Sequence, residues 1–397
     1  MNKQKFDVVI LAGGKGTRIK KYLNGQPKPM VKIKNITFLE TLIQNISKYN
    51  VNNIIILAGF RGKKIHKKFN NKKINLVNIK CIIEKKPLGT GGCLQLIKKD
   101  LTKKFVVMNG DTFFDIDLNS FSNFKIKKEE SLIALSKNNS YQQNTKLIGL
   151  SINEGKKIFL KKGAKLFNGG IYLFNKNFIN KIPKKNCSLE KDILEGEILK
   201  KKVYGKLFNN YFIDIGTPNN LKKANKTLVN YLFRPAVFLD RDGTINVDKG
   251  YTYKIKDLKL IDKTIKLIQY LKSKNYYIFI VTNQAGIAKG YFKINDFYNF
   301  QNNLKNVLFK KNILIDDVSF CPFHKKGIIK EYKKDSKFRK PDNLMISSLI
   351  KRYNINLKKS LVIGDKDTDK KCAKKIGLKY IDINSKFLDN ELKKFID

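Results

Sequence analysis

The sequence predicts two α/β domains, because short apolar runs with the pattern of buried strands recur along the chain and end in glycine or aspartate. Three runs carry this prediction: Phe6–Ala12 before a glycine-rich turn, Phe105–Asn109 before Asp111, and Ala236–Leu239 before Asp240. Open parallel sheets place their binding and catalytic groups at the carboxyl ends of the strands. With 397 residues, the chain is long enough for two domains that each bury a core.

The boundary between the domains is predicted near residue 233, which gives domains 1–233 and 234–397. Residues 219–232 have a helical pattern after Pro218, and Arg234-Pro235 ends it, because the residue before a proline avoids the helical conformation. No linker rich in glycine and serine intervenes, so we expect two closely coupled domains.

The composition favours a folded protein of a reducing compartment. Hydrophobic residues make up 42% of the chain, which excludes wholesale disorder. No apolar run approaches the roughly 20 residues of a membrane span, and the first residues lack the apolar segment of a signal peptide. The five cysteines are odd in number and scattered, as expected of free thiols. We therefore expect a cytoplasmic protein with no membrane partner.

The formal charge of +49 raises nucleic-acid binding as an alternative function. Only six of the 82 basic residues are Arg, and Lys is spread along the whole chain beside abundant Asn and Ile. That distribution is typical of the codon usage of an AT-rich genome, whereas phosphate-binding surfaces favour clustered basic residues with aromatic residues between them. We expect no specific nucleic-acid partner, and the sequence carries no signal for oligomeric state.

The first strand runs into Gly13-Gly14-Lys15-Gly16-Thr17-Arg18, and Lys28 follows between Pro27 and Pro29. Glycines let backbone N–H groups turn toward a phosphate, and a guanidinium such as that of Arg18 can bind the phosphate oxygens. The prolines restrict the backbone on both sides of Lys28, which holds one cation in place. A purely structural turn is the alternative reading of the glycines alone.

Together, Leu11–Arg18 and Pro27–Pro29 resemble the sugar-phosphate nucleotidyltransferases, which implies a Rossmann-like domain with a mixed, mainly parallel sheet. In that family Arg18 and Lys28 would neutralise charge during transfer. The resemblance implies nucleotide binding by Gly13, Gly14, Gly16 and Thr17, and by Gly89, Thr90 and Gly91 in a loop beside the base and ribose. It also implies Mg²⁺ binding by Asp111 and Asp214, and sugar binding by Asn168, Gly169, Glu190 and Lys162. Lys161 stands where the family usually has a glutamate.

In the second half, Asp240 and Asp242 follow an apolar strand directly. Their side chains would share one face if the extended geometry persists through Arg241. Two converging carboxylates suit a covalent nucleophile with a proton-transfer partner, a divalent metal site, or both. A solvated strand end is the plain alternative, because aspartate and glycine are ordinary turn residues.

Four motifs in order resemble the haloacid dehalogenase superfamily: Phe238–Asn246, Thr282–Gly290, Arg339–Pro341 and Ser360–Asp365. This implies a smaller, doubly wound sheet with a minimal cap near 247–258. Asp240 would form an aspartyl-phosphate, and Asp242 would act as general acid and base. The resemblance implies phosphoryl binding by Thr282, Asn283, Arg339 and Lys340, and Mg²⁺ binding by Asp240, Asp365 and the backbone carbonyl of Asp242. Asp369 would either support the metal shell or cap the helix that follows.

The second-half motifs are similar to the heptose bisphosphate and histidinol phosphate phosphatases, many of which hold zinc through a Cys-x-His and a later Cys-x-Cys. Here Phe323 and His324 follow Cys321, and Ser336-Lys-Phe338 replaces the later cysteines. One thiolate and one displaced histidine do not complete a four-ligand site. We therefore predict no structural zinc, and a buried, apolar setting for Cys321.

Both resemblances involve phosphorylated sugars, and the turns at 110–114 and 214–216 are similar to those of the heptose 1-phosphate guanylyltransferases. We interpret the chain as a bifunctional enzyme of NDP-heptose synthesis that uses Mg²⁺ in both domains, with small-molecule substrates. One alternative is a hexose-1-phosphate nucleotidyltransferase fused to another phosphatase, such as one for histidinol phosphate. The other is a basic nucleic-acid-binding or regulatory protein on retired enzyme folds.

Overall fold

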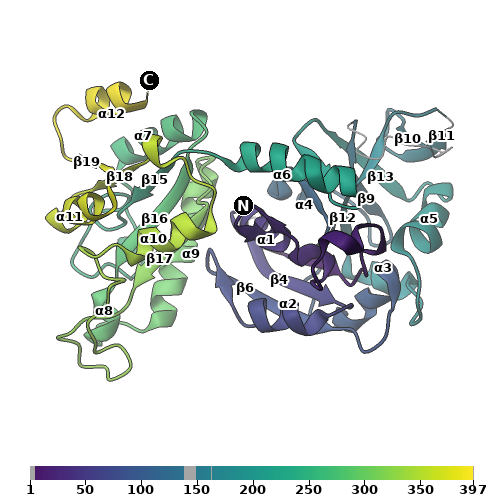
Figure 1. The fold of residues 1–397 in the computed structure, drawn as a ribbon, viewed down its shortest axis with the longest axis horizontal. Coiled ribbons are helices and arrows are strands. Elements are labelled where there is room, and N and C mark those ends of the chain that lie inside the picture. Colours follow the sequence, from purple (N-terminus) through teal and green to yellow (C-terminus); the bar gives the residue numbers. More distant parts are fainter. Residues whose placement is uncertain (1–4, 138–148, 162, 397) are drawn as a thin grey trace. The chain divides into compact units, whose positions relative to one another are not determined.

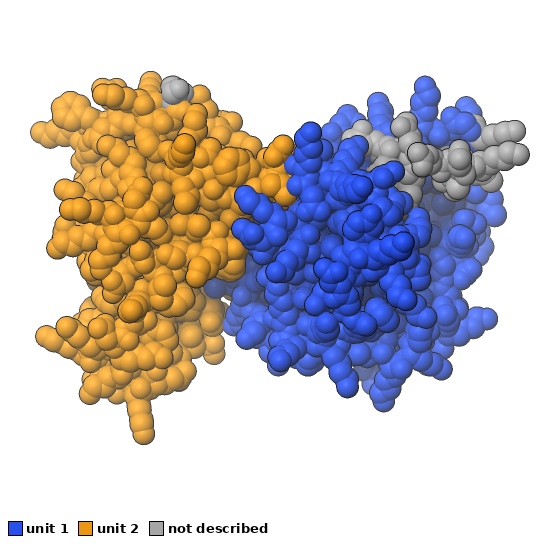
Figure 2. Space-filling model, viewed as in Figure 1, with its two compact units in different colours: residues 1–228 blue, residues 229–397 orange. Residues whose placement is uncertain are grey.

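The computed structural model describes residues 5–137, 149–161 and 163–396, and its chain divides into two compact units, 1–228 and 229–397 (Figures 1 and 2). Each unit is an α/β structure with a sheet of its own, which confirms the predicted fold class. None of the helices within the described ranges is both long and apolar enough to cross a membrane.

The division between the units falls inside helix α6 (Pro218–Leu232), whereas the boundary predicted from the sequence is residue 233. The last turn of α6 is bonded within the second unit. Asn354 Nδ2 donates to the carbonyl of Val229 over 2.7 Å, and the Tyr277 hydroxyl donates to that of Leu232 over 2.8 Å. The sequence pattern predicts a single helix here. It does not reveal that the last turn of this helix forms its hydrogen bonds within the second unit, while the first turn belongs to the first unit.

The first unit contains an eight-stranded mixed sheet (purple to teal in Figure 1). Its central strand β1 pairs in parallel with β4 and β7, while β12 runs antiparallel between β7 and β9. In spatial order the strands are β13 (Val203–Phe208), β9 (Ser131–Ser136), β12 (Phe167–Asn175), β7 (Lys104–Asn109), β1 (Phe6–Ala12), β4 (Val51–Ala58), β6 (Val77–Ile83) and β5 (Lys73–Ile74).

Shorter elements surround that sheet. Three two-stranded ribbons pair β8 (Thr112–Phe114) with β14 (Phe212–Asp214), β10 (Gly149–Ile152) with β11 (Ile158–Lys161), and β2 (Lys32–Ile33) with β3 (Ile36–Thr37). The helices are α1 (Phe38–Ser47), α2 (Gly62–Phe69), α3 (Gly89–Gly92), α4 (Leu118–Ser122), α5 (Glu195–Leu199) and α6. Helix α1 begins at a capping box, in which the Thr37 side chain and Glu40 satisfy each other's backbone N–H groups.

The second unit contains a five-stranded, fully parallel sheet in the order β17 (Asp317–Cys321), β16 (Tyr277–Asn283), β15 (Ala236–Leu239), β18 (Leu361–Gly364) and β19 (Lys379–Asp382). The order reverses direction at β15, which is the mark of a doubly wound sheet. Its helices are α7 (Asp262–Ser273), α8 (Ala285–Ala288), α9 (Ile294–Lys310), α10 (Leu344–Arg352), α11 (Asp367–Ile376) and α12 (Leu388–Ile396).

Every residue of β15 is buried, so both faces of this sheet are covered. Ala236 and Phe238 point into one core with residues of α10 and α11, and Val237 and Leu239 point to the opposite face. The predicted minimal cap at 247–258 contains one 3₁₀ turn, Ile255–Asp257, and no α-helix or strand. The end of β15 therefore opens into a loop, with Asp240 as its first residue.

Candidate active sites

The first unit has a cavity of about 530 Å³ at the carboxyl ends of β1, β6 and β7. Six of the predicted nucleotide, catalytic and metal residues lie in its lining: Gly13, Gly14, Lys28, Gly89, Thr90 and Asp111. These residues are far apart in the sequence and meet here because the carboxyl ends of neighbouring strands lie at the same edge of the sheet.

Gly13 lies where two backbone segments nearly touch. Phe60 N–H donates to the carbonyl of Gly13 over 3.1 Å, and a Cβ on Gly59 would lie 2.8 Å from the Gly13 Cα and carbonyl oxygen. A side chain does not fit at Gly59, so the close approach requires glycine there. This contact fixes the end of β1, where the backbone begins to line the cavity.

Lys28 begins a short 3₁₀ turn, Lys28–Met30, and only 8% of the residue is exposed. Its ammonium forms an ion pair with Asp111, which follows strand β7. The flanking prolines therefore hold a buried cation beside the first predicted metal ligand.

Asp214 lies beside Asp111 in the backbone pairing, because β14 pairs with β8 and Ile215 N–H donates to the carbonyl of Asp111 over 2.9 Å. Its carboxylate accepts hydrogen bonds from Gly216 N–H and from Asn220 Nδ2, each of 2.8 Å. A Cβ at Gly216 would lie 2.9 Å from Asp214 Oδ1, 3.5 Å from Lys28 Nζ and 3.6 Å from Arg18 Nη2. These charged side chains converge around a glycine, which leaves the space between them unfilled.

A chain of hydrogen bonds connects the predicted sugar residues to the cavity. Thr90 Oγ1 donates to Glu190 over 2.8 Å, Tyr172 donates to the other oxygen of Glu190 over 3.0 Å, and Asn168 Nδ2 donates to the Tyr172 hydroxyl over 3.0 Å. Burial, together with the charge of Glu190, raises the pKa of Tyr172, so its hydroxyl remains a donor. The oxygen of Asn168 is occupied by Gly170 N–H at 2.9 Å.

Other predicted residues of this unit lie outside the cavity lining. Gly16 has a φ of 64° and packs against the stem of Lys28, and Thr17 and Arg18 are exposed. Gly91 N–H donates to the carbonyl of Cys187 over 2.9 Å, and Gly169 packs against the ring of Phe114. Lys162 lies outside the described residues, and Lys161 beside it is exposed.

Glu84 lines the same cavity and is not among the residues predicted from the sequence. Burial raises the pKa of this half-buried carboxyl, and its Oε2 accepts a hydrogen bond from Leu88 N–H over 3.1 Å. Glu84 follows strand β6 directly, so the same strand-end reasoning could have identified it.

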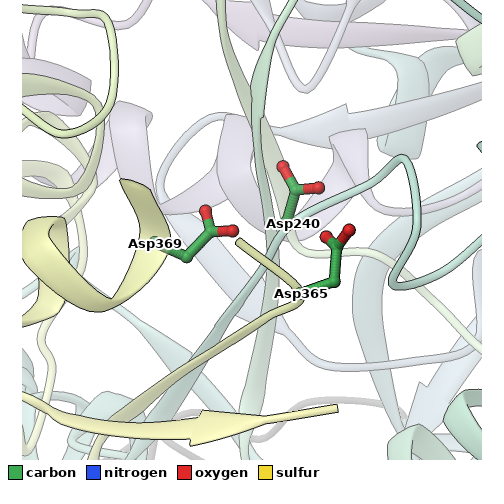
Figure 3. Close-up of side chains that lie close together, drawn as sticks. All are labelled: Asp240, Asp365 and Asp369. Atoms are coloured by element: carbon green, nitrogen blue, oxygen red, sulfur yellow. The ribbon is translucent and has the colours of Figure 1, made fainter. Parts of the chain in front are cut away.

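In the second unit, Asp240, Asp365 and Asp369 bring their carboxylates to one point (Figure 3). Asp240 and Asp365 follow the neighbouring strands β15 and β18, and Asp369 lies in the first turn of α11. One oxygen from each lies within 4.8 Å of the others, and no second such group of acidic, Cys or His side chains occurs in the part of the chain that the structure describes.

Lys340 lies among these acids and is 4% exposed. Its Nζ is 2.5 Å from Asp240 Oδ1 and 2.6 Å from Asp369 Oδ1, and it donates to the carbonyl of Val281 over 2.8 Å. Burial raises the pKa of Asp240 against the attraction of Lys340, with Asp369 and Asp242 adding to the rise. Burial would lower the pKa of Lys340, but the two carboxylates outweigh it and raise that pKa.

The predicted phosphoryl-binding residues have distinct surroundings. Asn283 uses both ends of its amide to hold Lys340, accepting from Lys340 N–H and donating to its carbonyl, each over 3.0 Å. Among the described residues, Nη1 of the half-buried Arg339 has no hydrogen-bond partner, which leaves it free to donate to an anion. Thr282 is buried at the end of β16.

The sequence allows Asp369 to cap α11 or to support a metal shell; the structure shows the cap and, in addition, an ion pair with Lys340. Its Oδ2 accepts from Lys366 N–H at the start of α11 over 3.3 Å, and its Oδ1 faces Lys340. Cys321 is fully buried, as predicted, and its thiol faces the carbonyl of Phe323. The Lys334 ammonium lies 4.1 Å from the centre of the Phe323 ring.

Comparison with known proteins agrees with the division of the chain into two different α/β units. Residues 7–231 match the nucleotidyl transferase family, and residues 337–390 match the HAD-hydrolase-like family. A D-glycero-alpha-D-manno-heptose-1,7-bisphosphate 7-phosphatase of Burkholderia mallei is 40% identical over 134 residues, which is 34% of this chain and 71% of that protein.

A D-glycero-alpha-D-manno-heptose 1-phosphate guanylyltransferase of Campylobacter jejuni is 35% identical over 219 residues, which is 54% of this chain and 96% of that protein. Among solved structures, HddC from Yersinia pseudotuberculosis is 30% identical with a TM-score of 0.46, covering 56% of this chain and 99% of that one. By the family match over 7–231 and by the two relatives, the chain belongs to the nucleotidyl transferase family in its first half and to the HAD-like phosphatases in its second.

Proposed function

We propose that this chain is a bifunctional enzyme of NDP-heptose synthesis. Its second unit would remove the 7-phosphate of D-glycero-D-manno-heptose 1,7-bisphosphate, and its first unit would transfer GMP from GTP to the resulting 1-phosphate, releasing pyrophosphate. The observation that carries the proposal is that each unit has its own carboxylate–lysine cluster at strand ends, Lys28–Asp111 in one and Lys340–Asp240 in the other.

The two relatives name the substrates: one is a heptose-1,7-bisphosphate 7-phosphatase and the other a heptose 1-phosphate guanylyltransferase, both of the alpha series. Their reactions are consecutive, because the phosphate that the hydrolase spares is the one that the transferase uses. The buried, unpaired state of all five cysteines agrees with a cytoplasmic enzyme.

In the transferase unit, an oxygen of the sugar 1-phosphate would attack the α-phosphorus of GTP, and the bond to pyrophosphate would break. No enzyme-bound intermediate is needed, so the protein contributes positioning and charge neutralisation. Gly13 and Gly14 would bind the nucleotide, Lys28 and Arg18 would neutralise charge, and Glu190 and Asn168 would hold the sugar hydroxyls.

In the phosphatase unit, an oxygen of Asp240 would attack phosphorus while Asp242 gives a proton to the departing sugar oxygen. Water would then hydrolyse the aspartyl-phosphate, and Asp242 would take the proton from that water. Lys340 would neutralise charge on the transferred group, and Arg339 and Thr282 would donate to its oxygens.

The donor sets fit Mg²⁺, which prefers oxygen ligands and keeps some of its waters. Asp240 and Asp365 would hold it in the second unit, with the backbone carbonyl of Asp242, which accepts no hydrogen bond from the described residues. Asp111 and Asp214 would hold it in the first. Such an ion would screen the negative charges of the reacting groups from each other.

The test is incubation of the full chain with heptose bisphosphate, GTP and Mg²⁺, with products identified by mass. We expect phosphate release followed by GDP-heptose. Asp240→Asn should stop both from the bisphosphate and leave transfer to supplied heptose 1-phosphate intact, whereas Asp111→Asn should stop only the transfer. Activity only with mannose 1-phosphate or histidinol phosphate would favour the other enzymatic reading, and no Mg²⁺-dependent activity on any of these substrates would overturn the proposal.

A further inference from the structure

The side chain of Asp242 is surrounded by donors from three directions. Arg241 donates from Nε to Oδ1 over 3.0 Å and from Nη2 to Oδ2 over 2.7 Å. Asn246 Nδ2 donates to Oδ1 over 3.0 Å, and Gln284 Nε2 donates to Oδ2 over 2.9 Å. Each oxygen of the ionised carboxylate therefore accepts two hydrogen bonds, and one of these donors must turn aside when Asp242 carries the proton that it gives to the leaving group.

Gln284 is the member of this group that also reaches the phosphoryl-binding strand. It follows β16 directly, it is 4% exposed, and its N–H donates to the carbonyl of Cys321 over 2.8 Å. Its side-chain Nε2 donates to Thr282 Oγ1 over 2.9 Å as well as to Asp242, and its Oε1 accepts from Arg241 Nη2 over 3.3 Å.

These neighbours fix which way the amide of Gln284 points. With oxygen and nitrogen exchanged, its oxygen would face the Asp242 carboxylate and its NH₂ would face the Arg241 guanidinium, so two attractions would become two repulsions. Arg241 is itself held firmly: it is 1% exposed, donates to the carbonyl of Thr252 over 2.8 Å, and lies 4.7 Å from the centre of the Phe300 ring.

We propose that Gln284 is a positioning residue for the phosphatase reaction, acting on Asp242 and Thr282 together. Its amide holds the carboxylate of Asp242 at a fixed place for proton transfer. Because the same amide occupies an acceptor position of Thr282, the single hydroxyl hydrogen of Thr282 is left to donate to a phosphoryl oxygen. Among the described residues, the Thr282 hydroxyl accepts from Gln284 and donates to no protein group. The inference rests on the proposed phosphatase function and deepens it.

The test compares two leaving groups in Gln284→Leu. Departure of the sugar alkoxide needs a proton from Asp242, whereas 4-nitrophenolate leaves as a stabilised anion and needs none. The kcat/KM covers steps up to leaving-group departure, so it reports the acid step without the later hydrolysis. We expect kcat/KM for heptose bisphosphate to fall by about 10- to 100-fold, which is the usual effect of removing a residue that hydrogen-bonds to an active-site side chain. The kcat/KM for 4-nitrophenyl phosphate should fall much less.

Gln301→Leu is the matched control, because Gln301 is another buried glutamine of the same unit whose amide atoms have no partner among the described residues. It should leave the ratio of the two kcat/KM values unchanged. If Gln284→Leu does not fold, the near-isosteric Gln284→Glu replaces the donating amide with an acceptor and should show the same selective loss.

Equal falls on both substrates in Gln284→Leu would overturn its action on Asp242, and no fall on either would overturn the positioning role as a whole. Failure of the proposed function gives a different result, because wild-type protein would then not hydrolyse heptose bisphosphate, whether or not it hydrolyses 4-nitrophenyl phosphate. The two failures are therefore separated by the wild-type measurement alone.

Discussion

Lys340→Met removes the cation that lies between two buried acids. Lys340 Nζ is 2.5 Å from Asp240 and 2.6 Å from Asp369, and the side chain is 4% exposed. Methionine keeps an unbranched side chain in the buried site but leaves the carboxylates without their partner. Removing one member of a buried ion pair costs about 3–5 kcal/mol. For a unit of this size each kcal/mol lowers the unfolding midpoint by about 2–4 °C, so a fall of about 6–20 °C is expected without metal at alkaline pH.

The loss of stability in Lys340→Met should depend on pH, and Asp240 sets the direction of that dependence. Burial raises the pKa of Asp240, and Lys340 opposes that rise, so the variant should raise it further. A group whose pKa is raised in the folded state contributes stability at low pH and loses it as the pH rises through the folded pKa. The deficit of Lys340→Met should therefore be smaller near about pH 5.5 than near about pH 8, and Mg²⁺ should also reduce it.

Pulse proteolysis with mass spectrometry would follow fragments of the second unit separately from those of the first. Lys375→Met is the matched control, since Lys375 pairs with Asp342 at 2.5 Å on the surface and such pairs are worth about 0–1 kcal/mol. A Lys340→Met unit as stable as this control at alkaline pH, or equally destabilised at both pH values, would refute the reasoning.

One further substitution and two measurements on the native protein test other parts of the molecule. Gly169→Ala should destabilise the first unit by about 1–3 kcal/mol, because the new Cβ would lie 2.6 Å from the Phe114 ring; unchanged thermal unfolding would contradict this. The native thiols should react slowly with iodoacetamide, since burial raises the pKa of Cys81 to about 12 and that of Cys372 to about 11; rapid labelling of either in the native protein would show that the thiol is accessible. Elemental analysis after dialysis should find no zinc, and about one equivalent would overturn that expectation.

Much of the candidate chemistry could be predicted because it lies where strands end. Asp111, Asp240 and Asp365 each follow an apolar run, and parallel strands bring such ends to one edge. Glu84 satisfies the same rule after β6, although its neighbours Lys85 and Lys86 are equally compatible with a solvated turn.

Other contacts depend on tertiary packing that no local pattern contains. The amide of Asn283 holds the backbone of Lys340, which lies 57 residues later in the chain, and Gln284 reaches Asp242 across 42 residues. Asp369 serves both as a helix cap and as an ion-pair partner, and its position in the first turn of α11 predicts only the first.

Helix α6 has bonding partners in both units, unlike either of the candidate active sites. Asn220 in its first turn bonds to Asp214, whereas its last turn is anchored by Tyr277 and Asn354. A cut at the division between the units would keep all of these bonds but would break α6 within the helix, so each excised fragment would carry only part of it. Each unit expressed alone is thus expected to have a frayed helix end at the cut, which the intact chain does not have.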